Sequence, residues 1–136
     1  MSDLSVTAAN VDPADNAIII NGTAGATITA GQSIYKDSTD NKIKLADADS
    51  SLATAAAVGI SLNGASDDQP IQYQSSGDID IGATLTVGEI YLVSDTAGRI
   101  APEADVGSGG WVTILGVATA TDNLKMGLFA SSAQVP

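Results

Sequence analysis

The feature that most constrains this chain is a stretch of sequence that occurs twice. Each copy has a glycine, then an acid or amide, then an Ile-Tyr pair: Gly31-Gln32-Ser33-Ile34-Tyr35 and Gly88-Glu89-Ile90-Tyr91. The two glycines are 57 positions apart, and so are Gly59 and Gly116 further along the chain. A spacing kept across several segments indicates an internal duplication of a roughly four-stranded unit. The repeat covers about 27–76 and 84–132.

The glycines of the repeat have two expected roles. Gly31 and Gly88 should reverse the chain, because glycine accepts conformations that other residues avoid. Gly59 and Gly116 lie inside apolar strand patterns, which indicates bulges or a close approach of another backbone. The motif also predicts that Ile34 and Ile90 enter the core and that Tyr35 and Tyr91 hold equivalent places in the two halves.

The local pattern predicts an all-β chain. Short runs rich in β-branched residues are separated by turn signals about every ten residues, which is typical of a sandwich or barrel. The expected strands are 17–23, 26–30, 32–36, 42–45, 57–62, 70–74, 78–81, 90–93 and 111–117. Asn21-Gly22 is a strong hairpin signal and should join the first two of these. The fold class is a small β-barrel or β-sandwich built from two similar multi-stranded halves, with at most one short helix around 49–56, capped by Asp49 or Ser50.

The N-terminal residues have a different sequence pattern from the rest of the chain. Residues 1–15 predict an extended N-terminal arm with a turn at Asp12-Pro13, and residues 16–136 predict a single β domain. The arm is either a loose terminus or a segment that lies on a neighbouring molecule. Residues 1–5 lack the basic and apolar parts of a secretory signal, so synthesis in a cytoplasm without export by that route is expected.

Composition excludes several classes of function. The chain has 136 residues, 16 acids against 5 bases and a formal charge of -11. The few cations form no run, so binding to nucleic acid or to an anionic membrane surface is not expected. Without Cys or His, disulfide scaffolds, thiolate sites and the commonest general base are absent. A surface with so few charges suits homo-oligomer contacts or packing on a larger assembly, although an ordinary Ser/Thr-rich β domain would look similar.

Paired carboxylates are the only candidates for catalysis. A glycosidase needs two carboxyl groups that flank a groove, usually with aromatic platforms for the sugar. The pairs are Asp47/Asp49, Asp67/Asp68 and Asp78/Asp80. Aromatic residues are only 4% of the chain, and Asp78 and Asp80 alternate with isoleucines, which places them on the solvent side of a strand. We therefore expect solvated acids and no catalytic residue.

Metal and cofactor sites are not expected either. The segments 37–41 and 47–50 are rich in oxygen ligands, but they lack the glycine and the bidentate glutamate of a calcium loop. Turn and cap chemistry explains them better. The glycine-rich segment 107–110 precedes a strand, whereas phosphate loops open a helix, so a flexible loop is predicted. Trp111 should close a barrel end or a subunit contact.

Six segments resemble small capsid decoration (cement) proteins of tailed bacteriophages. They are 31–38 (GQSIYKDS), 45–50 (LADADS), 57–60 (AVGI), 87–98 (VGEIYLVSDTAG), 100–102 (IAP) and 112–119 (VTILGVAT). The resemblance covers roughly residues 25–136. It implies a β-barrel or β-sandwich protein, commonly a homotrimer, that is assembled in the host cytoplasm. Such a protein sits on the outside of the capsid, clamps major capsid protein subunits together and often reaches a neighbour with its N-terminal arm.

Two other classes of function make different predictions. A head-fibre or tail-associated module that binds host-surface glycans predicts exposed aromatics on one face, for example Tyr35, Tyr73 and Trp111. A polysaccharide hydrolase predicts that acids such as Asp47, Asp49 and Asp78 face each other in a groove. The resemblance favours a structural protein without enzymatic activity.

Overall fold

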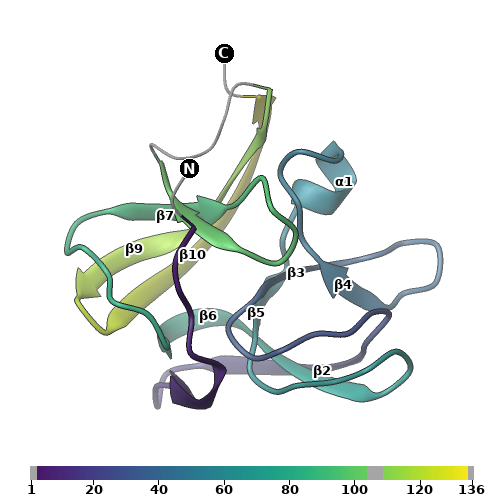
Figure 1. The fold of residues 1–136 in the computed structure, drawn as a ribbon, viewed down its shortest axis with the longest axis horizontal. Coiled ribbons are helices and arrows are strands. Elements are labelled where there is room, and N and C mark those ends of the chain that lie inside the picture. Colours follow the sequence, from purple (N-terminus) through teal and green to yellow (C-terminus); the bar gives the residue numbers. More distant parts are fainter. Residues whose placement is uncertain (1–2, 104–108, 135–136) are drawn as a thin grey trace.

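A single curled, antiparallel β-sheet forms the framework of the molecule, in a computed structural model that describes residues 3–103 and 109–134 (Figure 1). Strands account for 49% of the chain and helix for 6%, and the sheet closes about halfway into a barrel. The predicted fold class, a small all-β fold with one short helix, is confirmed.

The sheet order follows the duplication seen in the sequence. Its ten strands are β1 (Val11–Pro13), β2 (Ile18–Thr23), β3 (Ser33–Lys36), β4 (Ile43–Leu45), β5 (Gly59–Ser61), β6 (Pro70–Ile81), β7 (Ile90–Val93), β8 (Ile100–Pro102), β9 (Trp111–Ala120) and β10 (Asn123–Gln134). The order across the sheet is β4-β3-β5-β6-β10-β9-β7-β8, and β1 and β2 pair with β6 outside this path. We call β3, β4, β5 and residues 70–76 of β6 the first half, and β7 to β10 the second half.

The two halves pair their strands in the same register. Ile34 lies opposite both Leu45 and Gly59, and Tyr91 lies opposite both Pro102 and Gly116. Each residue of the second set is 57 positions after its counterpart in the first. The strands β3, β4 and β5 therefore have β7, β8 and β9 as their counterparts.

The turn glycines have the predicted conformation. Gly31 has a φ of 85° and Gly88 a φ of 86°, in the left-handed region that favours glycine. The Gly31 N–H donates to the Ser61 carbonyl at 2.8 Å, and the Gly88 N–H donates to the Ala118 carbonyl at 2.8 Å. Both bonds tie the turn to the counterpart strands β5 and β9.

The tyrosines of the motif are not equivalent. Register places Tyr91 where the first half has Ile34, and both side chains are buried. Tyr35 and Ile90 are only half-buried, so the predicted core position of Ile34 is confirmed and that of Ile90 is wrong. The second copy has one residue fewer between its glycine and its Ile-Tyr pair, and a shift of one residue turns every side chain of a strand to the other face.

The buried apolar side chains form two hydrophobic cores, and the second also contains Ile60 from β5 of the first half. The first core consists of Ala24, Ile28, Ile34, Ile43, Ala65, Ile71 and Tyr73. The second includes Leu85, Tyr91 and Ile100, which are 57 positions after Ile28, Ile34 and Ile43. The duplicated sequence thus builds two similar cores, and burial of such side chains is the main favourable term in folding.

The predicted hairpin at Asn21-Gly22 is wrong. Both residues lie inside β2, which pairs with the distant strand β6, and Asn21 is opposite Gln72. Glycine fits closely at position 22, where an added Cβ would lie 3.1 Å from Cγ1 of the buried Ile43. The strand expected at 26–30 is also absent, and only a single bridge joins Ile28 to Ala65.

The strands expected at 70–74 and 78–81 are one continuous strand, β6, which bends at Gly77. Gly77 has a φ of 93°. The Gln74 side chain braces this bend, since its Nε2 donates to the carbonyls of Ser76 and Asp78 at 3.0 and 2.9 Å. The bent strand belongs to both halves and joins them.

The helix α1 (Leu52–Ala55) is shorter than predicted and has a different cap. Ser51 is the cap residue, and its Oγ accepts a hydrogen bond from the Thr54 N–H at 3.2 Å. Thr54 Oγ1 accepts in return from the Ser51 N–H at 3.0 Å, which completes a capping box. Neither Asp49 nor Ser50 holds this position.

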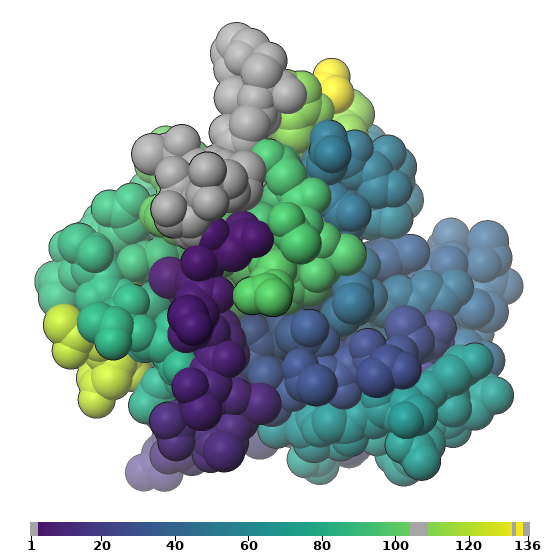
Figure 2. All heavy atoms as spheres, in the orientation of Figure 1, coloured from purple at the N-terminus to yellow at the C-terminus, as the bar shows by residue number. Residues whose placement is uncertain are grey.

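The N-terminal residues run across their own domain, as Figure 2 shows in purple. The Leu4 N–H donates to the Ile100 carbonyl and the Thr7 N–H to the Gly82 carbonyl, both at 2.8 Å. A 3₁₀ turn, η1 (Ala8–Asn10), leads into β1, which pairs with the end of β6. The segment predicted as an extended arm therefore contributes a strand to the sheet.

Candidate functional site

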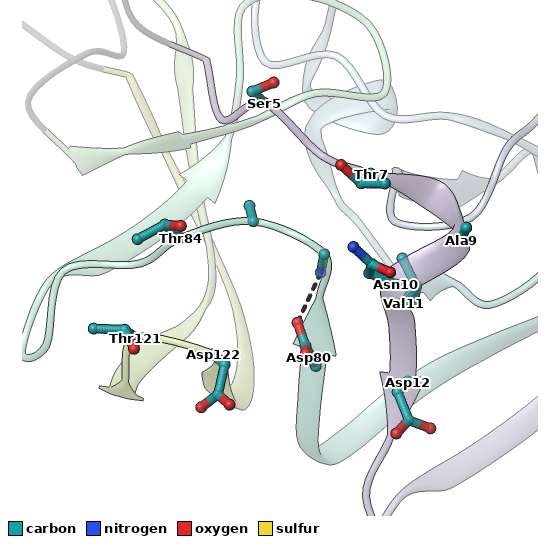
Figure 3. Close-up of a pocket in the computed structure, with 12 residues that line it drawn as sticks. Ser5, Thr7, Ala9, Asn10, Val11, Asp12, Asp80, Thr84, Thr121 and Asp122 are labelled. Atoms are coloured by element: carbon teal, nitrogen blue, oxygen red, sulfur yellow. Dashed lines mark hydrogen bonds between the residues drawn. The ribbon is translucent and has the colours of Figure 1, made fainter.

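A polar pocket lies where the N-terminal segment crosses the second half (Figure 3). Its volume is about 780 Å³. Three separate segments, 5–12, 80–84 and 121–122, line it, and their side chains are mostly hydroxyls, amides and carboxylates. The lining residues are Ser5, Thr7, Ala9, Asn10, Val11, Asp12, Asp80, Gly82, Ala83, Thr84, Thr121 and Asp122. Such a pocket can hold a hydrogen-bonding ligand.

Three carboxylates reach this pocket without forming a catalytic pair. Asp80 Oδ1 accepts a hydrogen bond from the Gly82 N–H at 2.9 Å, which fixes the chain where it leaves β6. The carboxylates of Asp12 and Asp122 point away from that of Asp80 in Figure 3. Sequence reasoning singled out Asp80 but not Asp12 or Asp122 as site residues, because the fold brings them together from distant segments.

Asp78 has different hydrogen-bond partners from Asp80. Its two carboxylate oxygens accept hydrogen bonds from the side-chain amides of Asn16 at 2.9 Å and Asn123 at 3.1 Å. The hydrogen bonds from Asn123 and Asn16 lower the pKa of the Asp78 carboxyl below its usual value. Its backbone N–H donates to Asn16 Oδ1 at 2.9 Å, so Asp78 ties the segment before β2 to the bend of β6 and to β10.

The other carboxylate pairs have structural contacts. Asp47 Oδ1 accepts from the Asp49 N–H at 3.0 Å, which is the turn chemistry predicted for this segment. Asp67 lies 3.7 Å from Nζ of Lys42, and Asp68 forms a closer ion pair with the same ammonium group. A polysaccharide hydrolase would require Asp47, Asp49 and Asp78 to face each other in a groove, and none of these contacts joins Asp78 to the other two.

The oxygen-rich turn at 37–41 is held by Lys44. Its Nζ lies 2.7 Å from Asp37 Oδ2 and 3.1 Å from Asp40 Oδ2. The hydrogen bond from Lys44, together with hydrogen bonds from Thr39, holds the pKa of the Asp37 carboxyl far below its usual value. Asn41 follows with a φ of 59°. The predicted turn chemistry accounts for these oxygens.

The aromatic residues named for the glycan-binding alternative do not form one exposed face. Tyr73 is only 6% exposed and belongs to the first core. Tyr35 packs against the second core, and Trp111 is half-buried at the start of β9. The aromatic cluster that this alternative predicted is therefore wrong.

A second surface is an apolar groove on the outer side of the second half. Its volume is about 420 Å³, and its lining residues are Ile90, Ile114, Gly116, Val117, Lys125, Met126 and Gly127. Phe129, which pairs with Ile114, and Val87, three positions before Ile90, are each 60% exposed. We call this surface the β9–β10 groove. Sequence reasoning missed it, because alternating strands do not show which face stays uncovered.

The described residues give no metal cluster and no membrane helix. Within residues 3–103 and 109–134, no three acidic side chains meet in a way that could hold a metal ion. No helix in that part of the chain is long and apolar enough to span a bilayer. Of the glycine-rich segment 107–110, residues 107 and 108 lie outside the described residues. Comparison with protein-family models, curated proteins and solved structures finds no match.

Proposed function

We propose that the chain is a structural virion protein that decorates the outside of a tailed-phage capsid and stabilises contacts between major capsid subunits. The observation that carries this proposal is the exposure of large apolar side chains along the β9–β10 groove in a chain with few charges. Phe129 and Val87 beside this groove are each 60% exposed. Exposed apolar patches mark surfaces that bind other proteins.

The sequence resemblance supports the same role. The segments that carry it, such as 31–38 and 87–98, include the turns and strands of the repeated framework. A protein with this role needs no reaction. It binds the assembled shell in preference to free subunits and so shifts the equilibrium towards the shell. Many copies, here proposed as homotrimers, add their contributions.

Binding to stripped capsids tests the proposal. Purified heads of the phage that encodes the chain, freed of this protein, are mixed with it and sedimented. We expect co-sedimentation and a higher temperature of DNA release. Replacing Phe129 by Ser should weaken binding about tenfold, which corresponds to about 1.4 kcal/mol.

The matched control is Leu52→Ser on α1. Leu52 is 42% exposed and lies outside the β9–β10 groove, so its replacement should leave capsid binding unchanged. A wild-type chain that stays in the supernatant, with heads no more stable than before, would refute the decoration role.

The alternative role is a head-fibre or tail-associated module that binds host-surface glycans. The polar pocket favours it, because hydroxyl, amide and carboxylate groups there could bind sugar hydroxyls. This role predicts binding on a glycan array that Asp12→Asn and Asp122→Asn abolish. Silence on the array together with capsid binding would exclude it.

A further inference from the structure

Strand β2 is an exposed and uncharged edge of the sheet. Its isoleucines Ile18, Ile19 and Ile20 are 57%, 44% and 38% exposed, although neighbouring residues of a strand point to opposite faces. Residues 16–35 contain no Asp, Glu, Lys or Arg. Proteins usually protect such edges with charges, proline or bulges, because an open edge pairs with other strands.

The other edges of the described sheet are protected. The Gly25 N–H donates to the Ile43 carbonyl of β4 at 2.7 Å, and the Leu4 N–H donates to the Ile100 carbonyl of β8 at 2.8 Å. Strand β1 is only three residues long and contains Asp12 and Pro13.

The outer part of β10 is irregular. Its pairing shifts register between Met126 and Phe129 and again between Ala130 and Gln134, so it does not offer a regular row of hydrogen-bonding groups. The pairing of β2 with β6 shifts register only between Ile18 and Ile19 and is regular from Ile19 to Thr23. Among the described strands, this part of β2 is therefore the longest regular edge without protection.

The duplication shows which segment of the second half lies beside the counterpart of β2. Tyr73 lies opposite Ser61, and Leu124 lies opposite Ala118, the counterpart of Ser61, so Leu124 holds the place of Tyr73 in the second half. On their other sides, Tyr73 lies opposite Ile20 and Leu124 lies opposite Ile79. The end of β6 is thus the counterpart of β2. Strand β1 pairs with it there, and Ile79 is fully buried. In the first half, no described segment of the chain takes the place of β1 beside Ile20.

We propose that a second copy of this chain fills this place, so that two β2 strands pair antiparallel across a twofold axis. The partner strand is β2 itself because the other described edges are covered, short or irregular. A chain of charge -11 repels its own copies, and the uncharged stretch around β2 lets two copies approach with the least repulsion. The pairing joins copies in even numbers, and with the homotrimers proposed above it joins two trimers.

Single cysteines test this contact directly. The chain has no Cys, so an introduced cysteine can form a disulfide only between two chains. Residues directly opposite in antiparallel strands have Cα atoms about 4.5–5.5 Å apart, a distance that a disulfide spans. The variants are Ile19→Cys, Ile20→Cys and Asn21→Cys. The control is Phe129→Cys, which is more exposed but lies on β10.

Mild oxidation at micromolar protein should link at least one β2 variant at least tenfold faster than the Phe129 variant. Native mass spectrometry of the wild-type chain should give an even multiple of 13.5 kDa. Equal crosslinking rates, or a wild-type mass of one or three chains, would overturn the proposal.

A charge placed on the edge gives a second measurement. Ile19→Lys sets like charges against each other across the twofold and should halve the native mass, with the circular dichroism spectrum unchanged. Phe129→Lys should leave the mass unchanged. If Ile19→Lys keeps the wild-type mass, or if Phe129→Lys alone halves it, the contact lies elsewhere. Should Ile19→Lys fail to fold, the cysteine rates decide.

Discussion

Gly116 offers the sharpest test of how the repeated framework is packed. It lies in β9, in a conformation open to other residues, yet a Cβ placed on it would lie 2.3 Å from the carbonyl oxygen of Lys125 on β10. The same Cβ would lie 3.0 Å from the Cα of Met126. Both neighbours are backbone atoms, which cannot rotate away as a side chain does. Gly116→Ala therefore forces β9 and β10 apart.

The expected cost follows from this geometry. A carbon–oxygen contact of normal length needs roughly 1 Å more than the gap at Gly116 allows. Overpacking of a folded interior costs about 1–3 kcal/mol, and each weakened ladder hydrogen bond costs about 0.5–1.5 kcal/mol. We expect Gly116→Ala to lower the free energy of unfolding by about 3 kcal/mol. For a chain of this size, that lowers Tm by about 12 °C.

Gly127 provides the matched control on the adjacent strand. An added Cβ there meets nothing within 4 Å, so Gly127→Ala should change the free energy of unfolding by less than about 0.5 kcal/mol. Urea denaturation of both variants, followed by circular dichroism, measures the difference. Similar midpoints for Gly116→Ala and Gly127→Ala would refute the argument that backbone contact requires glycine in β9.

Three further changes test other parts of the structure. The hydrogen bond from Lys44 lowers the pKa of Asp37 in the folded state, so the ionised carboxylate stabilises the fold. This stabilisation is present above the unfolded pKa of 3.8 and is lost as the pH falls through the lower folded pKa. Urea midpoints measured from pH 7 down to pH 2 should fall less steeply for Asp37→Asn than for wild type, and equal slopes would contradict the assignment. Ser51→Ala removes the cap of α1 and should lower the free energy of unfolding by about 1 kcal/mol in thermal melts. An unchanged Tm would mean that the capping box contributes nothing. Ile60→Thr should cost about 2 kcal/mol because Ile60 is fully buried, while Val117→Thr, at the half-exposed counterpart position, should cost less than about 1 kcal/mol; equal costs would mean that the two faces are packed alike.

Local signals were sufficient to predict most of the strands. The run 42–45 became β4 with Ile43 buried, and the segment around Gly59 became β5 with the close backbone approach that glycine indicated. A Cβ on Gly59 would lie 2.3 Å from the Gln74 carbonyl oxygen, as at Gly116. These features depend on neighbours in sequence or on a pattern repeated at fixed spacing, so the sequence shows them.

Long-range pairing was not predictable in the same way. Asn21-Gly22 has the composition of a tight turn, but β2 is stabilised more by hydrogen bonds to β6 at six paired positions. The Tyr35 and Tyr91 assignment failed because one missing residue changes the face that a strand presents. The polar pocket is lined by three segments that only the folded chain brings together, so no single motif could indicate it.

The duplication explains why an apolar groove remains open on the second half. In the first half, Ile60 and Gln74 share a face, and both are fully buried. Their counterparts in the second half, Val117 and Lys125, line the β9–β10 groove. The turn 94–99 closes on the first half, where the Ser33 N–H donates to the Gly98 carbonyl at 3.1 Å and the Ser33 Oγ donates to the Arg99 carbonyl at 3.0 Å. Among the described residues, no corresponding turn covers the same face of the second half, which leaves the β9–β10 groove open to a partner outside the chain.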